Sequence, residues 1–275
     1  METRGFPVDL EGKVVIVTGS SRGIGRAIAI DSARKGARVV VTARTETAGK
    51  LPGTIYETAD EIEKRGGKAL AIRCDVSSED DVAAMVQKVL AEFGRIDALI
   101  NNAAVGLYTP FLEVQTRHWD LVFRVNVRGP FLGTKAVLPT MIAQKSGAIV
   151  NISSGAAENV FSLITGSGGE KRTSGCAYGS SKAALERLTR GIAEELKAYN
   201  IAANALKPSQ PTYSEGVTFW RPEAELSQFR SAHLYMSPAA LFLASQDARG
   251  VTGGIFYDEE LCKQYGLSPI SSIAG

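Results

Sequence analysis

Short apolar runs alternate with longer amphipathic segments along most of this chain. Seven of these runs have the length and composition of buried strands, because they are nearly continuous in apolar residues and are followed by glycine, proline or polar residues. The pattern predicts strands at 13–19, 37–43, 69–76, 96–104, 147–154, 201–208 and 253–258.

The segments between these runs carry apolar residues at helical spacing. Residues 54–67 place Ile55, Ala59 and Ile62 on one helical face and end in two glycines, which stop a helix. Ser78 is placed to cap the next helix. Further helices are predicted directly after the first strand, after Thr116, through Tyr178 and Lys182 toward Tyr199, and over 237–245 with Ser237 as the cap.

Regular alternation of strand and helix indicates parallel βαβ units, and therefore an α/β protein with a doubly wound sheet of about seven parallel strands and helices on both faces. No linker divides the pattern, so residues 1–275 are expected to form a single domain with its core at about 10–258. Two segments, 155–175 and 209–236, are rich in Gly, Ser, Thr, Pro or charge. We expect them to be variable loops on the substrate side.

Composition excludes several function classes. The 275 residues include 31 Lys plus Arg and 29 Asp plus Glu, and this net charge of +2 argues against a nucleic-acid or membrane partner held by charge. Cys74, Cys176 and Cys262 are far apart and have no CxxC spacing, and the histidines are His118 and His233. No metal site is expected, and with no apolar leader segment the chain is expected to be cytoplasmic.

A glycine-rich turn, TGSSRGIG, joins the first strand to the first helix. Glycines allow the tight turn and the close approach of a pyrophosphate, which the N–H groups and positive dipole end of the helix can bind. This context predicts a Rossmann-type dinucleotide site, although an ordinary glycine-rich βα turn is the alternative. The expected contacts are Gly19, Ser21, Arg22, Gly23, Ile24 and Gly25.

Two arginines bear on the choice of nucleotide. Sites for NAD usually have an acid at the end of the second strand to bind the ribose 2′-OH, whereas this chain has Arg44 there and Arg22 in the glycine turn. Two guanidinium groups can clamp a 2′-phosphate, so NADP(H) is predicted over NAD(H); the alternative is that both arginines are solvated. At the end of the third strand, Asp75 could accept a hydrogen bond from adenine beside Val76, or be a turn or cap residue.

Five motifs occur in the order and approximate spacing of the short-chain dehydrogenase/reductase family: TGSSRGIG at 18–25, NNAA at 101–104, Asn126, NISS at 151–154 and YGSSK at 178–182. The chain resembles this family over about residues 10–258. The segment LPGTIYETADEIE and the tail FYDEELCKQYG are similar to its hydroxysteroid-dehydrogenase-like branch, which does not establish a steroid substrate.

The resemblance implies a catalytic set. Tyr178 corresponds to the family's general acid or base, and Lys182, four residues on and on the same helical face, favours phenolate, whose parent phenol has a pKa of about 10. Lys182 also corresponds to the lysine that holds the nicotinamide ribose. Ser154, with Ser153 as the neighbouring candidate, corresponds to the serine that binds the substrate oxygen. Asn126 corresponds to an asparagine that holds a water linking the lysine to solvent.

The resemblance also implies the reaction and the assembly. An NADP(H)-dependent hydride transfer between nicotinamide and a carbonyl or secondary alcohol is expected, with Tyr178 giving or taking the proton. Asn102, Ala103 and Pro208 are expected at the cofactor. A homotetramer or homodimer is expected, with the long helices packing across a two-fold axis. For the substrate, an apolar or aromatic small molecule is expected, contacted by Val105, Leu107, Tyr108, Val160, Phe161 and Phe219 or Trp220.

The chain departs from the family pattern at several places. Ala104 replaces the usual glycine of NNAG, and Ser154 and Tyr178 are about ten residues further apart than is common, so a flap around TGSGGEKRTSG is expected. Ser209 replaces a glycine after Pro208. In the family, the backbone N–H three residues after this proline normally binds the nicotinamide carboxamide. In this chain that position is Pro211, which has no N–H, so either the loop shifts by one residue or that contact is lost.

Two other function classes remain open at this level. The altered loop at Pro211 would suit a sensor or scaffold that binds NADP(H) without turnover, although such a protein has little need of the four catalytic candidates. An epimerase or dehydratase on the same fold is a further alternative within the enzymes.

Overall fold

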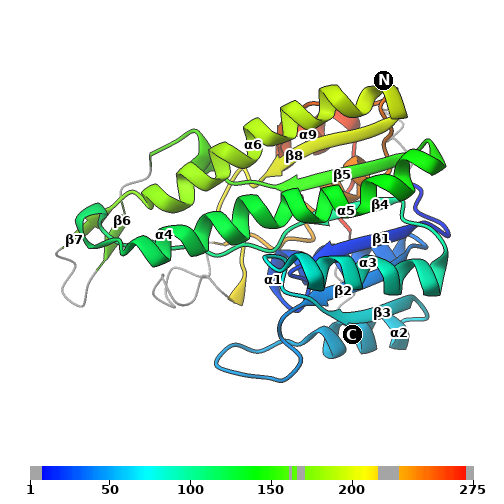
Figure 1. Cartoon of the computed structure of the whole chain (residues 1–275), viewed down its shortest axis with the longest axis horizontal. Coiled ribbons are helices and arrows are strands. Elements are labelled where there is room, and N and C mark those ends of the chain that lie inside the picture. The colour runs from blue at the N-terminus through cyan, green and yellow to red at the C-terminus, as the bar shows by residue number, and fades with distance from the viewer. Residues whose placement is uncertain (1–7, 161–162, 166–170, 216–228, 271–275) are drawn as a thin grey trace.

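The computed structural model describes residues 8–160, 163–165, 171–215 and 229–270 (Figure 1). Seven parallel strands form one sheet in the order β3-β2-β1-β4-β5-β8-β9. The predicted doubly wound α/β architecture is therefore confirmed. The strands are β1 Val14–Thr18, β2 Arg38–Ala43, β3 Lys68–Arg73, β4 Ala98–Asn101, β5 Gly147–Ile152, β8 Ile201–Lys207 and β9 Ile255–Tyr257.

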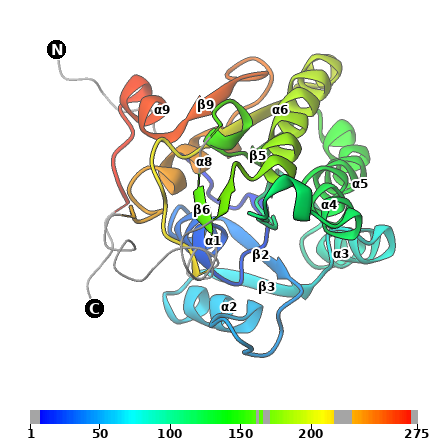
Figure 2. The ribbon, with the colours of Figure 1, turned by 90° about the vertical axis from the view of Figure 1, so that its left-hand side faces the viewer.

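Helices cover both faces of the sheet. In Figure 2 the carboxyl ends of the strands point toward the viewer. Helices α3, α4, α5 and α6 lie on one side of the sheet, and α1, α2, α8 and α9 lie on the other. Their bounds are α1 Gly23–Arg34, α2 Ile55–Lys64, α3 Glu79–Phe93, α4 Thr116–Phe123, α5 Gly129–Gln144, α6 Cys176–Leu196, α8 Met236–Ala244 and α9 Asp258–Tyr265. Short turns of other helix types lie at Phe111–Glu113, Arg124–Arg128, Gly155–Ala157 and Lys197–Tyr199.

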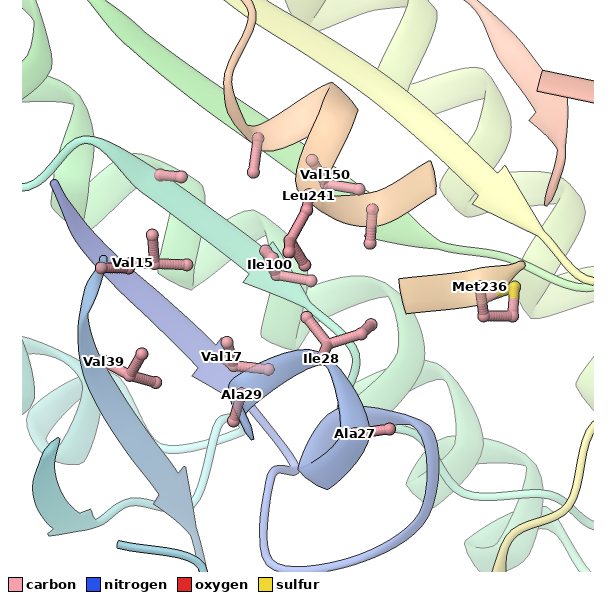
Figure 3. Packing of buried hydrophobic residues seen from close by; sticks show 14 of the residues in the cluster. Val15, Val17, Ala27, Ile28, Ala29, Val39, Ile100, Val150, Met236 and Leu241 are labelled. Atoms are coloured by element: carbon pink, nitrogen blue, oxygen red, sulfur yellow. The ribbon is translucent and has the colours of Figure 1, made fainter. Parts of the chain in front are cut away.

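Each central strand is buried on both sides because its alternate residues enter two different cores. Val15 and Val17 of β1 pack with Ile28 of α1 and Leu241 of α8 (Figure 3). Their neighbours on β1, of which Ile16 is one, pack under α3, α5 and α6 instead. This explains why the strands are continuous apolar runs in the sequence and show no alternation.

Side-chain caps define two of the helix starts. Thr54 and Glu57 form a capping box at α2, in which each side chain accepts a hydrogen bond from the other's backbone N–H, at 3.0 and 2.9 Å. Ser78 accepts the N–H of Asp81 at the start of α3, which confirms its predicted role as a cap. At the other end of α3, Gly94 adopts a left-handed conformation (φ 71°) that ends the helix.

The predicted cap at Ser237 is wrong. Helix α8 begins at Met236, so Ser237 is its second residue and Tyr235 occupies the cap position without a side-chain hydrogen bond. Every residue of α8 is buried, and the helix starts earlier because Met236 packs in the core shared with α1 (Figure 3).

Other boundaries also differ from the sequence pattern, and one of them is the end of β5, which lies at Ile152 and not at residue 154. Strand β3 ends at Arg73 and β4 at Asn101, so the polar residues that follow them are free to enter the site. The long helix after Thr116 is interrupted by the π-helical turn Arg124–Arg128. The segment 155–175, expected as an irregular loop, contains an antiparallel hairpin of β6 Leu163–Thr165 and β7 Lys171–Thr173.

The structure also continues beyond the predicted core boundary at about residue 258. Helix α9 begins at Asp258 and packs on α8, where the ring centroids of Phe242 and Tyr265 are 4.4 Å apart. The sequence pattern indicates only a tail in this segment.

Candidate active site

A cavity of about 1270 Å³ lies at the carboxyl ends of the strands, where the strand order reverses between β1 and β4. Such a switch point is where doubly wound sheets bind ligands, because the loops on either side diverge. Every residue expected at the cofactor lines this one cavity: Gly19, Ser21, Arg22, Gly23, Ile24, Gly25, Arg44, Asp75, Val76, Asn102, Ala103, Tyr178, Lys182 and Pro208. Ser154 lines it as well.

The glycine turn is packed against the NNAA segment too closely for larger residues. A Cβ atom on Gly19 would lie 2.8 Å from Cα of Ala103, and one on Gly25 would lie 2.3 Å from Nδ2 of Asn102. That amide donates to the carbonyls of Thr18 and Gly19 at 2.9 and 3.2 Å. The Thr18 hydroxyl in turn accepts the N–H groups of Asn102 and Ala103, so the first residue of the glycine motif, to which the sequence assigned no role, joins the two motifs.

Arg22 lies at the start of α1 and supports a neighbouring loop. Its guanidinium donates to Oγ1 of Thr45 at 3.2 Å and to the carbonyl of Gly53 at 3.0 Å. Its Nε is buried and has no hydrogen-bond partner among the described residues. A partly buried guanidinium with a donor to spare suits an anionic ligand in the adjoining cavity.

Arg44 and Asp75 face each other across the same end of the cavity. The Arg44 side chain is 58% exposed, and its Nη1 lies 3.9 Å from Oδ2 of Asp75. Asp75 also accepts the N–H and hydroxyl of Ser77 at 2.9 and 2.8 Å, so the turn-residue alternative describes part of its role. Partial burial raises the pKa of Asp75, but the Ser77 hydrogen bonds and the charges of Arg44 and Arg124 outweigh it and hold the pKa below its usual value.

Tyr178 and Ser154 meet at the centre of the cavity. Tyr178 lies in the first turn of α6, and Ser154 stands directly after β5, at the start of the turn Gly155–Ala157. Burial raises the pKa of the Tyr178 phenol, and its hydrogen bond with the Ser154 hydroxyl acts in the opposite direction. The phenol is therefore protonated at neutral pH and is paired with a hydroxyl that can share a substrate oxygen.

Lys182 reaches the same point from one helical turn further along α6. It is buried, its Nζ donates to the carbonyl of Ile152 at 2.7 Å, and it lies 5.7 Å from the centre of the Tyr178 ring. Burial lowers the pKa of Lys182 to about 8, against the opposing charge of Glu186. The sequence placed Tyr178 and Lys182 on one helical face, and the structure brings both to the cavity.

Asn126 stands behind the cavity and does not line it. The π-helical turn presents its side chain to Val105, whose N–H and carbonyl it binds at 2.8 and 3.0 Å. Its Nδ2 also donates to the hydroxyl of Ser181, which donates to the carbonyl of Tyr178. Such π-helical turns are frequent at functional sites. Asn126 thus braces the start of α6 against the loop after β4.

The substrate end of the cavity is lined in part by aromatic and apolar side chains. The rings of Tyr108 and Tyr178 are 5.7 Å apart and tilted by 50°, and a Cβ on Gly175 would lie 2.9 Å from the Tyr108 ring. Among the expected substrate contacts, Val105, Tyr108 and Val160 line the cavity and Leu107 does not. The other three candidates, Phe161, Phe219 and Trp220, lie outside the described residues.

The predicted loop 209–236 also lines the cavity, mostly through residues to which the sequence pattern assigned no role. The segment after β8 contributes Gln210, Pro211, Thr212 and Ser214, with Phe229 beside them. Gly23 would clash with this segment if it carried a side chain, because its Cβ would lie 2.7 Å from that of Ser214. The loop therefore closes over the glycine turn, a contact between positions about 190 residues apart that local pattern cannot predict.

No group of three or more His, Cys, Asp or Glu side chains in the described ranges could hold a metal ion. None of the helices in this part of the chain combines the length and the apolar character that crossing a membrane requires.

The sequence and the fold match known proteins over most of the chain. Residues 13–217 match the family described as short chain dehydrogenase. Hydroxysteroid dehydrogenase-like protein 2 of Bos taurus is 36% identical over 259 residues, which cover 94% of this chain and 59% of that protein. The chain therefore spans about half to three fifths of the length of the curated relatives it matches.

Solved structures show the same similarity. A short-chain type dehydrogenase/reductase from Mycobacterium marinum superposes with a TM-score of 0.76 and 30% identity, over 91% of this chain and 95% of its own. A metagenomic short-chain oxidoreductase in complex with NADP gives a TM-score of 0.72 and 32% identity, over 90% and 97%.

Proposed function

Because this chain belongs to the short-chain dehydrogenase family, we propose that it transfers a hydride between NADP(H) and a carbonyl or secondary alcohol, with Tyr178 as general acid and base. One observation carries the proposal: the Tyr178 phenol, hydrogen-bonded to Ser154 and beside Lys182, opens into the cavity that the glycine turn also lines. The cofactor supplies the hydride when bound, and the protein supplies orientation and a proton.

The residues divide this work between them. The glycine turn and the N-terminus of α1 would hold the pyrophosphate, and Lys182 would hold the nicotinamide ribose. The Ser154 hydroxyl would donate a hydrogen bond to the substrate oxygen. In reduction the Tyr178 Oη gives its proton to that oxygen, and in oxidation it takes the proton back; the ammonium of Lys182 stabilises the phenolate that remains after reduction.

NADP(H) is the proposed cofactor because the polar end of the cavity is cationic. Arg44 is exposed at the cavity wall, and Arg22 has a buried Nε without a partner in the described part of the chain. Both groups can bind the 2′-phosphate. Asp75 stands nearby and would accept a hydrogen bond from adenine. The metagenomic relative in complex with NADP supports this choice.

The loop around Pro211 bears on the non-catalytic alternative. Pro211 cannot donate to a carboxamide, but Gln210 and Thr212, on either side of it, carry N–H groups and line the cavity. A shift of one residue would therefore restore the contact. This favours an enzyme over an NADP(H)-binding sensor or scaffold.

The substrate class and the assembly are proposals of the same kind. Tyr108, Val105 and Val160 at the substrate end favour an apolar or aromatic carbonyl compound. A homodimer or homotetramer is proposed from the family resemblance, and light scattering that returned a monomer would contradict it. Three free cysteines, Cys74, Cys176 and Cys262, suit the proposed cytoplasmic location.

The test starts with cofactor binding. The purified protein is titrated with NADPH and with NADH while nicotinamide fluorescence is followed, and then it is assayed with a panel of ketones and aldehydes. NADPH binding followed by net NADPH consumption supports the proposal. Binding without turnover of any carbonyl compound would indicate the sensor, and NADH preference would overturn the cofactor assignment.

A further inference from the structure

One of the largest fully buried side chains of the described residues carries a charge. Lys207, the last residue of β8, is 1% exposed and does not line the cavity. Its Nζ lies 2.5 Å from Oε1 of Glu158, 3.3 Å from Oε1 of Glu186 and 4.7 Å from the centre of the Tyr257 ring. A buried ammonium is costly even when it is paired, and an apolar residue of similar size could fill the space. Nothing in the proton transfer described above uses it.

Glu186 connects this lysine to the catalytic helix. It lies on α6 four residues after Lys182, so it shares a face with Lys182 and Tyr178. Its Oε1 accepts the Ser153 hydroxyl at 2.7 Å as well as the Lys207 ammonium. One buried carboxylate therefore acts on two buried ammonium groups, Lys207 by contact and Lys182 through its charge.

Glu158 connects Lys207 to the other end of the same segment. It ends the helical turn that begins after Ser154, and Ser154 Oγ accepts the N–H of Ala156 at 3.2 Å within that turn. The Ala156 carbonyl lies against α6 at Gly179, where a Cβ would be only 2.8 Å away. Lys207 thus holds the residues before and after Ser154 at once.

We propose that Lys207 is a positioning residue, which acts through Glu186 and Glu158 to fix the segment 153–157, and with it the Ser154 hydroxyl, against Tyr178. Through the charge of Glu186 it also sets the proton affinity of Lys182. The inference rests on the proposed function, because it assigns these residues a part in the same proton transfer.

Several titratable groups surround Lys207 and Glu186, and they influence one another's pKa values. Burial lowers the pKa of Lys207, but the hydrogen bonds and charges of Glu158 and Glu186 outweigh it and raise the pKa, so this ammonium stays charged. Tyr257 faces it from β9, where burial and Glu158 raise the phenol's pKa. Glu158, paired with Lys207 and near Arg190, has a lowered pKa. Lys182 lies one helical turn before Glu186 on α6, and burial lowers its pKa to about 8. It lies beside the phenol of Tyr178, whose pKa is raised by burial.

Two substitutions should therefore move the pKa of Lys182 in opposite directions. Lys207→Met removes the cation that competes for Glu186, so the carboxylate acts on Lys182 alone and its pKa should rise by about half a unit. Glu186→Gln removes the carboxylate, so the pKa should fall by about half a unit. Glutamine keeps the size of the side chain and an oxygen that can accept from Ser153, so this variant should fold even if Lys207→Met does not.

The direct measurement is an NMR titration of lysines labelled at Cε. The Lys182 signal is identified by its loss in Lys182→Met, and Lys197→Met, an exposed lysine beyond the end of α6, is the matched control that should change nothing. Opposite shifts in Lys207→Met and Glu186→Gln support the proposal. An unchanged Lys182 pKa in Glu186→Gln overturns it, because Glu186 is then not coupled to the site.

Kinetics complete the test. Both variants should lower kcat about tenfold and leave the KM for NADPH within twofold, and the alkaline limb of the pH profile should follow the Lys182 pKa. If both variants lost kcat equally and the alkaline limb of the pH profile did not move, the role of Lys207 would be purely structural. That result would contradict the proposed electrostatic coupling to Lys182. If the unmodified protein has no turnover, the proposed function fails, while the NMR titration still decides the coupling of Lys207, Glu186 and Lys182.

Discussion

The Asp258 carboxylate accepts two hydrogen bonds from Ser209, one from its backbone N–H at 2.7 Å and one from its hydroxyl at 2.6 Å. Asp258 is buried at the start of α9, and Ser209 follows Pro208 at the wall of the cavity. The segment treated as a tail in the sequence analysis therefore anchors the loop in which the usual glycine is replaced by Ser209.

Removing this anchor should loosen the cofactor loop. In Asp258→Ala, the two donors of Ser209 lose the Oδ1 acceptor that they share in a partly buried place, so the free energy of unfolding should fall by about 2 kcal/mol and NADPH should bind several-fold more weakly. Asp258→Asn keeps the accepting Oδ1 and should therefore keep most of the free energy of unfolding and most of the NADPH affinity. Urea denaturation and fluorescence titration measure the two effects. Equal loss in the Asn and Ala variants would show that the charge, and not the hydrogen bonds, holds the loop.

The cofactor preference should depend on Arg44. Because its guanidinium is exposed at the cavity wall, Arg44→Ala should weaken NADPH binding by about tenfold through loss of a charged hydrogen bond and leave NADH binding nearly unchanged. Arg249→Ala, at an exposed arginine outside the cavity, is the control. Paired titrations with the two nucleotides give the ratio. A parallel loss for both nucleotides would assign Arg44 to loop structure instead of phosphate binding.

The proton transfer should depend on Tyr178. The Tyr178→Phe protein keeps the ring beside Tyr108 but has no proton to give, so NADPH should still bind while kcat falls by about 10²- to 10⁴-fold. Tyr199→Phe, at an exposed tyrosine beyond the end of α6, should behave as the unmodified protein. Steady-state rates and fluorescence titration separate the two effects. Retained turnover in Tyr178→Phe would mean that another group is the proton donor.

The charge of Lys182 should cost stability near neutral pH. With a pKa of about 8 in the folded protein against an ordinary value of 10.5, burial of its ammonium costs on the order of 3 kcal/mol below pH 8. The unfolded chain binds more protons between those two pH values, so this contribution makes stability rise with pH across that window.

Lys182→Met should therefore be more stable than the unmodified protein at pH 7 by about 1–3 kcal/mol, and the difference should shrink above pH 10. Turnover should be lost. Lys88→Met, at an exposed lysine of α3, should show no such pH-dependent difference. Urea denaturation at pH 7, 9 and 10.5 gives the comparison. A variant that is less stable at pH 7 would show that the Lys182–Ile152 hydrogen bond outweighs the desolvation of the charge.

The strands of the sheet and most residues of the candidate site could be predicted from the sequence alone. Strands buried on both faces must be apolar throughout, and the helices between them must show helical periodicity. The pattern of apolar residues therefore predicted the seven strands and the helices that connect them. The glycine turn could be predicted because backbone segments that approach each other closely, as at Gly19 and Gly25, leave no room for a Cβ atom. The pairing of Tyr178 with Lys182 could be predicted because a spacing of four residues places both side chains on one face of a helix.

The contacts between residues far apart in the chain could not be predicted from the sequence. The contact of Ser214 with Gly23, the anchor from Asp258 to Ser209 and the pairing of Lys207 with Glu158 and Glu186 join positions far apart in the chain. Local periodicity carries no information about such contacts, since it reports which face of an element is buried and not what buries it. Lys207 shows this most clearly, because a lysine at the end of a strand has the pattern of a solvated residue, and only packing makes it a buried ion.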